Sequence, residues 1–347
     1  MAAVSGDADC FCGGGADLKS VYRCFCMDLQ CNVNGKIHMG VLPPPLGGVS
    51  VYLYRLRKLH PEDDFIDPRF ISICALINIM LTTTREIVLE GINWRQLFLL
   101  RLVKCFRSNK YSVVLHGRGW LNDINLAGFF KKKIMIFSLK GCCSIRVVGN
   151  HMKDELVEVL PLYEGEIIVR DAFLPPPLED EPKILATYPD EMRNFMEVQR
   201  PLIVANAFQL ADWNGIDLYG LDMCIELIHR LKKKYPSVGL LFALANEQYR
   251  TDYYAKMRGL IADYGLERNV YFLTDQHELW PILKDCDVMV RPTCTDGYGV
   301  SVAEALYFNR PAVASDVCKR SDGCVVFRNR DMDDFEMKVC QVLERGK

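Results

Sequence analysis

The chain has 347 residues, of which 50% are hydrophobic and 25% charged, as in an ordinary globular protein and unlike a disordered or fibrous one. At roughly 150 residues per domain, this length predicts two domains. The 42 basic and 44 acidic side chains give a formal net charge of -2. Because no overall positive field exists to hold a nucleic-acid backbone, we expect no nucleic-acid partner.

The sequence also lacks the marks of a membrane-spanning or secreted chain. Its most apolar run, residues 70–81, contains Ser72 and Asn78 and is far shorter than the roughly 20 apolar residues that cross a bilayer. Residues 1–10 carry acids where a secretion signal has basic residues. We therefore expect a cytoplasmic protein.

The chain has 15 cysteines, an odd number. Those in apolar runs are expected to be reduced thiols of the core: Cys74, Cys105, Cys224 and Cys340. A second group lies near the N-terminus, at Cys10, Cys12, Cys24, Cys26 and Cys31. Four of these thiolates could hold zinc, but the gaps within the pairs are shorter than those of common zinc ribbons. We interpret residues 1–35 as a disordered leader, with a metal site as the alternative.

From residue 36 onward, short apolar runs alternate with amphipathic segments, which predicts parallel strands joined by crossover helices. In the first half we expect strands at 36–42, 86–91, 111–117, 143–149 and 165–173, and helices at 50–59, 93–107 and 151–160. Residues 66–82 are ambiguous between strand and helix, because their apolar run lacks a clear period.

Residues 174–201 are rich in proline and acid, so no strand or long helix is expected there. The alternation then resumes, with strands expected at 201–208, 238–245, 269–274, 287–292, 311–315 and 324–327, and helices at 220–235, at 253–264, from 300 and at 333–343. The pattern predicts an α/β fold of two Rossmann-like doubly wound domains, 36–174 and 201–347, with a linker at 175–200. In such a pair the ligand site lies at the carboxyl ends of the strands, most naturally in the central cleft between the domains.

The most informative segment reads RPTCTDGYGVSVAEALYFNRPAVASD. A strand is expected to end at its start, Gly297 and Gly299 permit a tight turn, and a helix begins near Val300. The free N–H groups and partial positive charge of a helix N-terminus can bind a diphosphate without any cation in the helix.

Two acids, Asp296 and Glu304, stand eight positions apart around this turn. One can reach the distal sugar of a bound ligand while the other reaches a ribose. As an alternative, Ser301 and Glu304 fit a capping box, in which the glutamate accepts a hydrogen bond from its own helix.

The segment resembles the carboxyl-terminal signature of retaining glycosyltransferase family 4, within the glycosyl transferases group 1 of GT-B fold. That family has two acids eight apart, a Gly-x-Gly between them, then Glu-Ala-Leu and a strand reading Pro-Val-Val-Ala-Ser-Asp. Here Asp296 replaces the usual first glutamate, and the strand is residues 311–316. Residues 43–49 (PPPLGGV) resemble the family's glycine loop, and His116 in VVLHGRG resembles the histidine that ends a later N-terminal strand. The resemblance covers residues 36–344.

The resemblance implies a role for each of these positions. Gly47 and Gly48 let the donor diphosphate pass close to the backbone, and His116 lies beside the reacting carbon. Asp296 and Glu304 hold hydroxyls of the sugar and the ribose. The turn and helix start bind the donor through Gly297, Tyr298, Gly299, Val300 and Ser301. No metal and no cofactor are implied, because the nucleotide-sugar is itself the substrate.

The chain departs from the family at the basic pair that neutralises the leaving diphosphate. Gln209 and Asn214 stand at the corresponding donor-side positions, and neutral amides can donate hydrogen bonds but cannot balance charge. The candidate replacements are Lys319 and Arg320 on the donor side and Arg118 on the acceptor side.

Two segments, 93–110 and 128–133, mix aromatic and aliphatic residues with lysine and arginine. Such segments can rest on anionic lipid at the inner face of a membrane, and related transferases often use lipid-linked acceptors. The alternative for residues 93–110 is a core helix with a solvated face.

The resemblance therefore implies a glycosyltransferase of hexosyltransferase type. It would move a sugar, with retention, from a nucleotide-sugar to a glycan or lipid-linked glycan, as in polysaccharide or cell-envelope glycan synthesis. Gln209 and Asn214 motivate one alternative, a protein that binds nucleotide-sugar or glycan without turnover. A sugar-nucleotide epimerase of the same fold is another.

Overall fold

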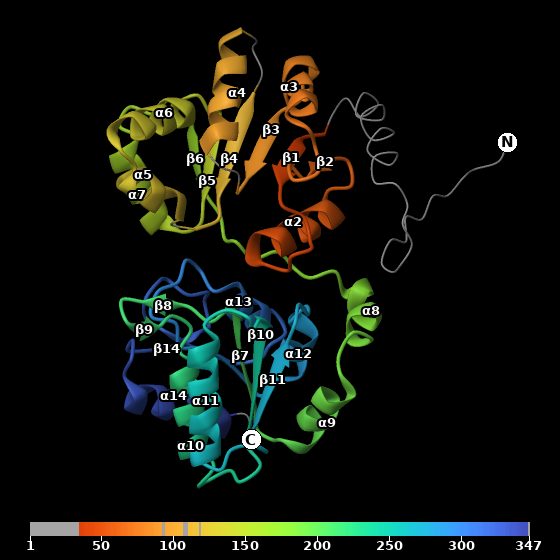
Figure 1. Ribbon diagram of the computed structural model, residues 1–347, viewed down its shortest axis with the longest axis vertical. Helices are drawn as coiled ribbons and strands as arrows, with labels where there is room; N and C mark the ends of the chain where they lie inside the picture. The colour runs from red at the N-terminus through yellow and green to blue at the C-terminus, as the bar shows by residue number, and fades with distance from the viewer. Residues whose placement is uncertain (1–34, 92–93, 107–109, 118, 346–347) are drawn as a thin grey trace, which may run out of the picture.

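The computed structural model describes residues 35–91, 94–106, 110–117 and 119–345. The expected leader, apart from Gly35, and Arg118 lie outside the described residues. Figure 1 shows two lobes, each built on a sheet with helices packed around it. We refer to them as the N-terminal and C-terminal domains.

The N-terminal domain contains a parallel sheet of six strands in the order β2-β1-β3-β4-β5-β6. The strands are β1 (Ile37–Gly40), β2 (Asp64–Ile66), β3 (Ile87–Glu90), β4 (Tyr111–Leu115), β5 (Ser144–Val147) and β6 (Glu166–Val169). Its helices are α2 (Gly48–Leu59), α3 (Ile73–Thr82), α4 (Trp94–Phe106), α5 (Gly119–Leu126), α6 (Phe129–Lys140) and α7 (Asn150–Val159). Strands β1, β3 and β4 are buried along their whole length, as expected when helices cover both faces of a parallel sheet.

The ambiguous segment 66–82 forms the end of β2 and helix α3. Ser72 precedes α3, and its side chain accepts a hydrogen bond from the Ala75 N–H at 3.2 Å. This N-cap satisfies an otherwise unpaired donor of the first helical turn, which fixes where the helix begins.

The segment between the two sheets contains only short helices. A 3₁₀ turn (Leu178–Asp180) leads into α8 (Glu181–Leu185), and α9 (Asp190–Val198) follows. In Figure 1 these helices run along one side of the molecule from the first lobe to the second.

The C-terminal domain has a second parallel sheet of six strands, in the order β11-β10-β7-β12-β13-β14. The strands are β7 (Leu202–Gln209), β10 (Gly239–Asn246), β11 (Val270–Thr274), β12 (Val288–Arg291), β13 (Ala312–Ser315) and β14 (Val325–Phe327). The helices are α10 (Leu221–Leu231), α11 (Thr251–Asp263), α12 (Trp280–Asp285), α13 (Val300–Tyr307) and α14 (Met332–Arg345). A small antiparallel hairpin, β8 (Asp212–Trp213) and β9 (Ile216–Asp217), follows β7. The predicted architecture of two doubly wound parallel sheets is confirmed.

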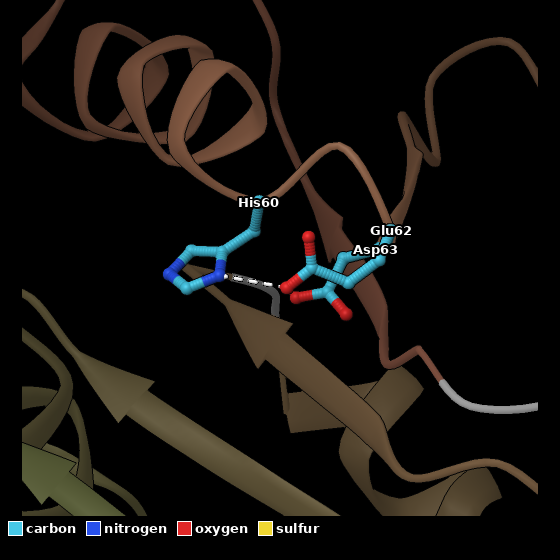
Figure 2. Close-up of side chains that lie close together, drawn as sticks. All are labelled: His60, Glu62 and Asp63. Atoms are coloured by element: carbon cyan, nitrogen blue, oxygen red, sulfur yellow. Dashed lines mark hydrogen bonds and ion pairs between the residues drawn. The ribbon is translucent and has the colours of Figure 1, made fainter.

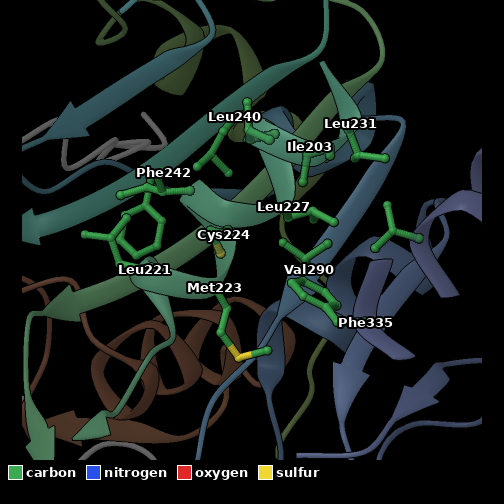
Figure 3. Close-up of a cluster of buried hydrophobic side chains, with 14 of the residues drawn as sticks. Ile203, Leu221, Met223, Cys224, Leu227, Leu231, Leu240, Phe242, Val290 and Phe335 are labelled. Carbon is green, nitrogen blue, oxygen red and sulfur yellow. The ribbon is translucent and has the colours of Figure 1, made fainter. Parts of the chain in front are cut away.

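Apolar side chains of helix and sheet meet in the core of the C-terminal domain, which Figure 3 shows around Cys224 and Phe242. Cys224 is fully buried, as expected for a thiol that behaves as a small hydrophobe. The same expectation is wrong for Cys74 and Cys105, which are exposed. The side chain of Cys340 is partly buried.

Helix α2 holds the two domains together. The N–H of Leu46, just before α2, donates to Gln276 Oε1 of the C-terminal domain at 2.7 Å. The hydroxyl of Tyr54 donates to Asp180 Oδ2 in the connecting segment at 2.6 Å. From the other side, Tyr298 of the C-terminal domain packs against the core of the N-terminal domain. None of the helices in the described residues has the length and apolar character of a membrane span.

Candidate active site

A cavity of about 170 Å³ lies between the two domains, and residues of both line it. We call it the cleft cavity. On the C-terminal side its walls are the carboxyl ends of β7, β10 and β11, the position where ligands bind in open α/β sheets. The lining residues on that side include Asn206, Phe208, Ala245, Asp275 and Glu278.

Two helices from different domains begin at the cleft cavity. Gly47 and Gly48 at the start of α2 line it, and so do Val300 and Ser301 at the start of α13. Helix N-termini present unpaired N–H groups and a partial positive charge. The cavity is therefore suited to an anionic group, and the structure brings together the glycine loop and the late helix that the sequence singled out.

Gly48 leaves open space beside this cavity. A Cβ built on Gly48 meets no atom within 4 Å, and one on Gly47 meets only the Ser50 hydroxyl, at 3.9 Å. Neither glycine has a positive φ, so the backbone does not require glycine at either position. What the missing side chains provide is room for a ligand to approach the backbone.

Gly299, in contrast, is required by the turn that precedes α13. Its φ is +81°, in the left-handed region, and a Cβ there would lie 2.8 Å from Nη1 of Arg320. Gly297 faces the other domain, because a Cβ on it would lie 3.9 Å from the Cα of Gly117, the residue after His116. The turn thus approaches the loop that carries His116.

The carboxylate of Asp296 is bound on both oxygens by groups of the C-terminal domain. Its Oδ2 lies 2.7 Å from Nε of Arg291 and 2.7 Å from Nη1 of Arg320, and its Oδ1 accepts the Gly297 N–H at 2.9 Å. Burial alone would raise the pKa of Asp296, but the two guanidinium groups outweigh it and hold the pKa well below its usual range. The structure does not place Asp296 among the residues that line the cleft cavity. Its carboxylate instead fixes the turn.

Arg320, a candidate replacement cation, is only 6% exposed and is occupied in the same network. Besides Asp296 it donates to the Ser315 carbonyl at 3.0 Å and lies 3.2 Å from the Thr293 hydroxyl. Lys319 is exposed on the loop after β13 and does not line the cavity. In this structure, therefore, neither Lys319 nor Arg320 lines the cleft cavity.

Glu304 lines the cavity and is held by an arginine of the opposite domain. Nη2 of Arg55, on α2, lies 2.5 Å from Glu304 Oε1 and 3.6 Å from Glu278 Oε2. Burial raises the pKa of Glu278 to about 7, opposed by Arg55 and reinforced by the charge of Glu304. The capping-box alternative for Glu304 is wrong, because α13 begins after Gly299 without any side-chain cap.

His116 lies at the end of β4, where its ring packs edge-on against Tyr52, with centroids 4.8 Å apart. Tyr52 in turn lines the cleft cavity. Nε2 of His116 lies 2.6 Å from Glu90 Oε2, and the other Glu90 oxygen lies 3.1 Å from Nδ1 of His38. Burial alone would raise the pKa of Glu90, but its hydrogen bonds to the two histidines outweigh this and lower the pKa to about 2.

Gln209 and Asn214 do not reach the cavity. Gln209 ends β7, and Asn214 is exposed at the tip of the β8–β9 hairpin, with φ of 54° beside Gly215 at 81°. Two left-handed residues form the tight turn that Asn-Gly favours in hairpins. The loop that should hold the basic pair is therefore a hairpin, and within the described residues its amides do not line the cavity.

A separate group of possible metal ligands lies at the end of α2, away from the cavity lining. The ligand atoms of His60, Glu62 and Asp63 lie within 4.8 Å of one another (Figure 2). Local contacts account for this grouping: His60 Nδ1 lies 3.0 Å from Glu62, and Asp63 accepts the Lys36 N–H at 2.6 Å and faces His38. We assign no metal to it.

Sequence reasoning missed Arg55, Glu278 and Glu90. For Arg55 a signal existed, because it follows Gly48 at helical spacing, with Val51 and Tyr52 on the same face of α2. Glu278 and Glu90 gave no such signal, since only the folded chain shows their partners.

Most of the C-terminal domain is similar to a known protein family. Residues 215–345 match the family model described as glycosyl transferases group 1. No curated protein matches the sequence.

Several solved structures are similar to the chain. HepE from Anabaena, in complex with UDP-glucose, is 13% identical, with a TM-score of 0.63 and coverage of 90% of each chain. Sucrose-phosphate synthase from Thermosynechococcus elongatus is 13% identical, with a TM-score of 0.61 and 90% of each chain covered. A glycosyltransferase from Rickettsia africae is 13% identical, with a TM-score of 0.62, covering 90% of this chain and 89% of that one. The chain thus has the GT-B fold of these structures, and within its C-terminal domain residues 215–345 are similar to the glycosyl transferases group 1 family.

Proposed function

We propose that the protein is a retaining glycosyltransferase that moves a sugar from a nucleotide-sugar to a glycan or lipid-linked glycan. The observation that carries this proposal is the convergence of two helix N-termini from different domains on one cavity that Glu304 also lines. Anion-binding amides beside a buried carboxylate suit a ligand with both phosphates and hydroxyls. The structure of HepE with UDP-glucose supports a nucleotide-sugar as that ligand.

In this proposal the N–H groups around Val300 and Ser301 bind the diphosphate, and Gly48 lets it approach the start of α2. Glu304 accepts hydrogen bonds from the ribose. His116 stands beside the reacting carbon in this proposal, and its ring contacts Tyr52, which lines the cavity. Asp296 acts through the turn that it holds, since both of its oxygens are engaged.

Retention in this proposal needs no protein nucleophile. The departing phosphate oxygen takes the proton of the acceptor hydroxyl on the same face from which that hydroxyl attacks. The protein then contributes by holding the acceptor at attack distance and by stabilising negative charge on the diphosphate. The amides of the two helices are donors for that charge, and the proposal assigns no role to a metal.

A lipid-linked acceptor is favoured by the surface near α6. Phe129 and Phe130 are 66% and 80% exposed, and Lys131, Lys132 and Lys133 follow them directly. Exposed aromatic rings beside lysines suit the interface of an anionic membrane. Helix α4 instead buries its apolar face in the core, which is the alternative given for residues 93–110.

A second candidate, binding without turnover, is favoured by the displacement of Gln209 and Asn214 from the cavity. The experiment that separates the candidates incubates the full chain with UDP-, GDP-, dTDP- and ADP-sugars and follows both nucleotide release and sugar identity. Release that increases with added glycan or polyprenyl-phosphate acceptor indicates transfer, and conversion of the sugar without acceptor indicates an epimerase. Binding with neither outcome supports the second candidate. Glu304→Gln should lower the turnover by on the order of a hundredfold.

A further inference from the structure

The guanidinium of Arg55 is buried between the domains. The side chain is 2% exposed and comes from the middle of α2, on the helix face that also presents Gly48 and Tyr52 to the cleft cavity. Its Nη1 donates to the Leu174 carbonyl at 3.0 Å, and its Nη2 meets Glu304 and Glu278. The guanidinium therefore lies at the boundary of the cavity and in contact with the carboxylate assigned to the ribose.

The cavity has a shortage of positive charge. Among the described residues that line it, Arg55 is the only lysine or arginine, whereas Asp275, Glu278 and Glu304 are acids. A nucleotide-sugar diphosphate is itself anionic, and like charges repel strongly where water is excluded. A cation beside the helix N-termini would offset this repulsion, and Arg55 is the lysine or arginine that the described cavity lining supplies.

Two residues that line the cavity each carry a buried polar atom without a partner in the described residues. These atoms are Nε of Arg55 and Oγ of Ser301. Leaving such a donor unpaired is unfavourable, so a buried donor without a partner marks a place where a ligand atom can accept. The two atoms belong to the two helices whose N-termini meet at the cavity.

We propose that Arg55 binds the donor diphosphate and replaces, from the N-terminal domain, the basic pair missing from the C-terminal domain. This inference rests on the proposed function, because it names the cation of the same site. In the empty protein Glu304 and Glu278 hold the guanidinium in place. When the donor binds, its phosphate oxygens replace the two carboxyl groups as hydrogen-bond acceptors of Arg55. The freed oxygens of Glu304 then accept hydrogen bonds from the ribose hydroxyls. Arg55 and Glu304 thus each have a partner both before and after binding.

The test measures binding of UDP, GDP, dTDP and ADP to the full chain by isothermal titration calorimetry. With the nucleotide that binds most tightly, Arg55→Gln should weaken binding by about 10- to 100-fold, the usual effect of losing a charge-assisted contact. Arg55→Lys keeps the charge and should recover part of the loss. Arg57→Gln, on the exposed face of the same helix, is the matched control and should bind as the native chain does.

Equal or tighter binding by Arg55→Gln would overturn the inference while leaving the proposed function intact. Absence of binding by the native chain to all four nucleotides would overturn both. Because Arg55→Gln leaves two buried carboxylates without a cation, a second variant guards against misfolding. Arg55→Gln with Glu278→Gln replaces the guanidinium and one of its two carboxyl partners by neutral amides, and it should show the same loss of binding. Glu278→Gln alone should bind the nucleotide at least as tightly as the native chain.

Discussion

Glu90, fully buried at the end of β3, lies 2.6 Å from Nε2 of His116 at the end of the neighbouring strand β4. The lowered pKa of Glu90, about 2, keeps its carboxylate ionised throughout the physiological range. A permanent negative charge therefore orients the ring of His116, which packs on Tyr52 at the cavity wall.

Replacing this carboxylate should impair catalysis more than binding. Glu90→Gln keeps the side-chain shape but loses the charge that orients His116, and we expect kcat to fall by as much as about 100-fold with little change in KM for the donor. Glu86→Gln is the control, since Glu86 precedes the same strand and contacts Ser112 and Lys36 instead. Steady-state kinetics check this, and equal effects of the two variants would contradict it.

Gly48→Ala should separate donor binding from stability. A methyl group there meets no protein atom and favours the helix, so the melting temperature should be unchanged or slightly raised. The same methyl group occupies space beside the anion site, and nucleotide affinity should fall by roughly 10-fold. Gly259→Ala in α11, which also meets no atom, is the matched control. A calorimetric titration in which both variants bind equally well would exclude Gly48 from the site.

Ser301→Ala removes a hydroxyl that has no partner in the described residues. The free energy of unfolding should therefore hardly change, while nucleotide diphosphate affinity drops by up to about 10-fold. Ser315→Ala gives the opposite pattern, because Ser315 donates to the Thr293 carbonyl at 2.6 Å. Its loss should destabilise the fold by about 1 to 3 kcal/mol. Urea unfolding and titration of both variants test the contrast, and it fails if Ser301→Ala is the less stable of the two.

The raised pKa of Glu278 predicts a pH effect on stability. The folded state keeps a proton on Glu278 up to a pKa of about 7, whereas the unfolded chain releases it near its ordinary pKa of 4.5. Over that window the folded state binds more protons, so its stability falls as the pH rises. Glu278→Gln should flatten the fall of the melting temperature between about pH 5 and 7, and the exposed Glu267→Gln should not. Identical pH profiles for all three chains would count against this assignment.

The aromatic pair at the start of α6 should bind anionic membranes. Phe129→Ser with Phe130→Ser removes exposed apolar surface, and binding to phosphatidylglycerol vesicles should weaken by roughly 10-fold or more in a flotation assay. Val198→Ser on α9, where the side chain is 68% exposed, controls for the loss of any exposed apolar group. If the double variant binds the vesicles as the native chain does, the proposed membrane contact of Phe129 and Phe130 is wrong.

The alternation of short apolar runs with amphipathic segments was sufficient to predict every strand of the two parallel sheets except β2. Two local signals were present but not used. Ser72 marks the start of α3, and Asn214 with Gly215 is a typical hairpin pair. Helices α5 and α6 were not predicted, since the start of α6 exposes aromatic residues that a simple apolar stripe would bury.

The partners of the charged residues could not be predicted. Sequence spacing suggested that Asp296 and Glu304 act together on a ligand. In the structure Asp296 instead forms ion pairs with Arg291 and Arg320, and Glu304 forms one with Arg55. Which cation reaches which acid depends on how two domains pack, and no local pattern encodes that.

Helix α2 begins with Gly48 at the cavity, carries Arg55 within it and is tied by Tyr54 to Asp180 at the start of the connecting segment. A helix of 12 residues moves as one stiff rod. A displacement of Arg55 by a bound ligand would therefore be passed along the helix to Asp180, in the segment that joins the two lobes.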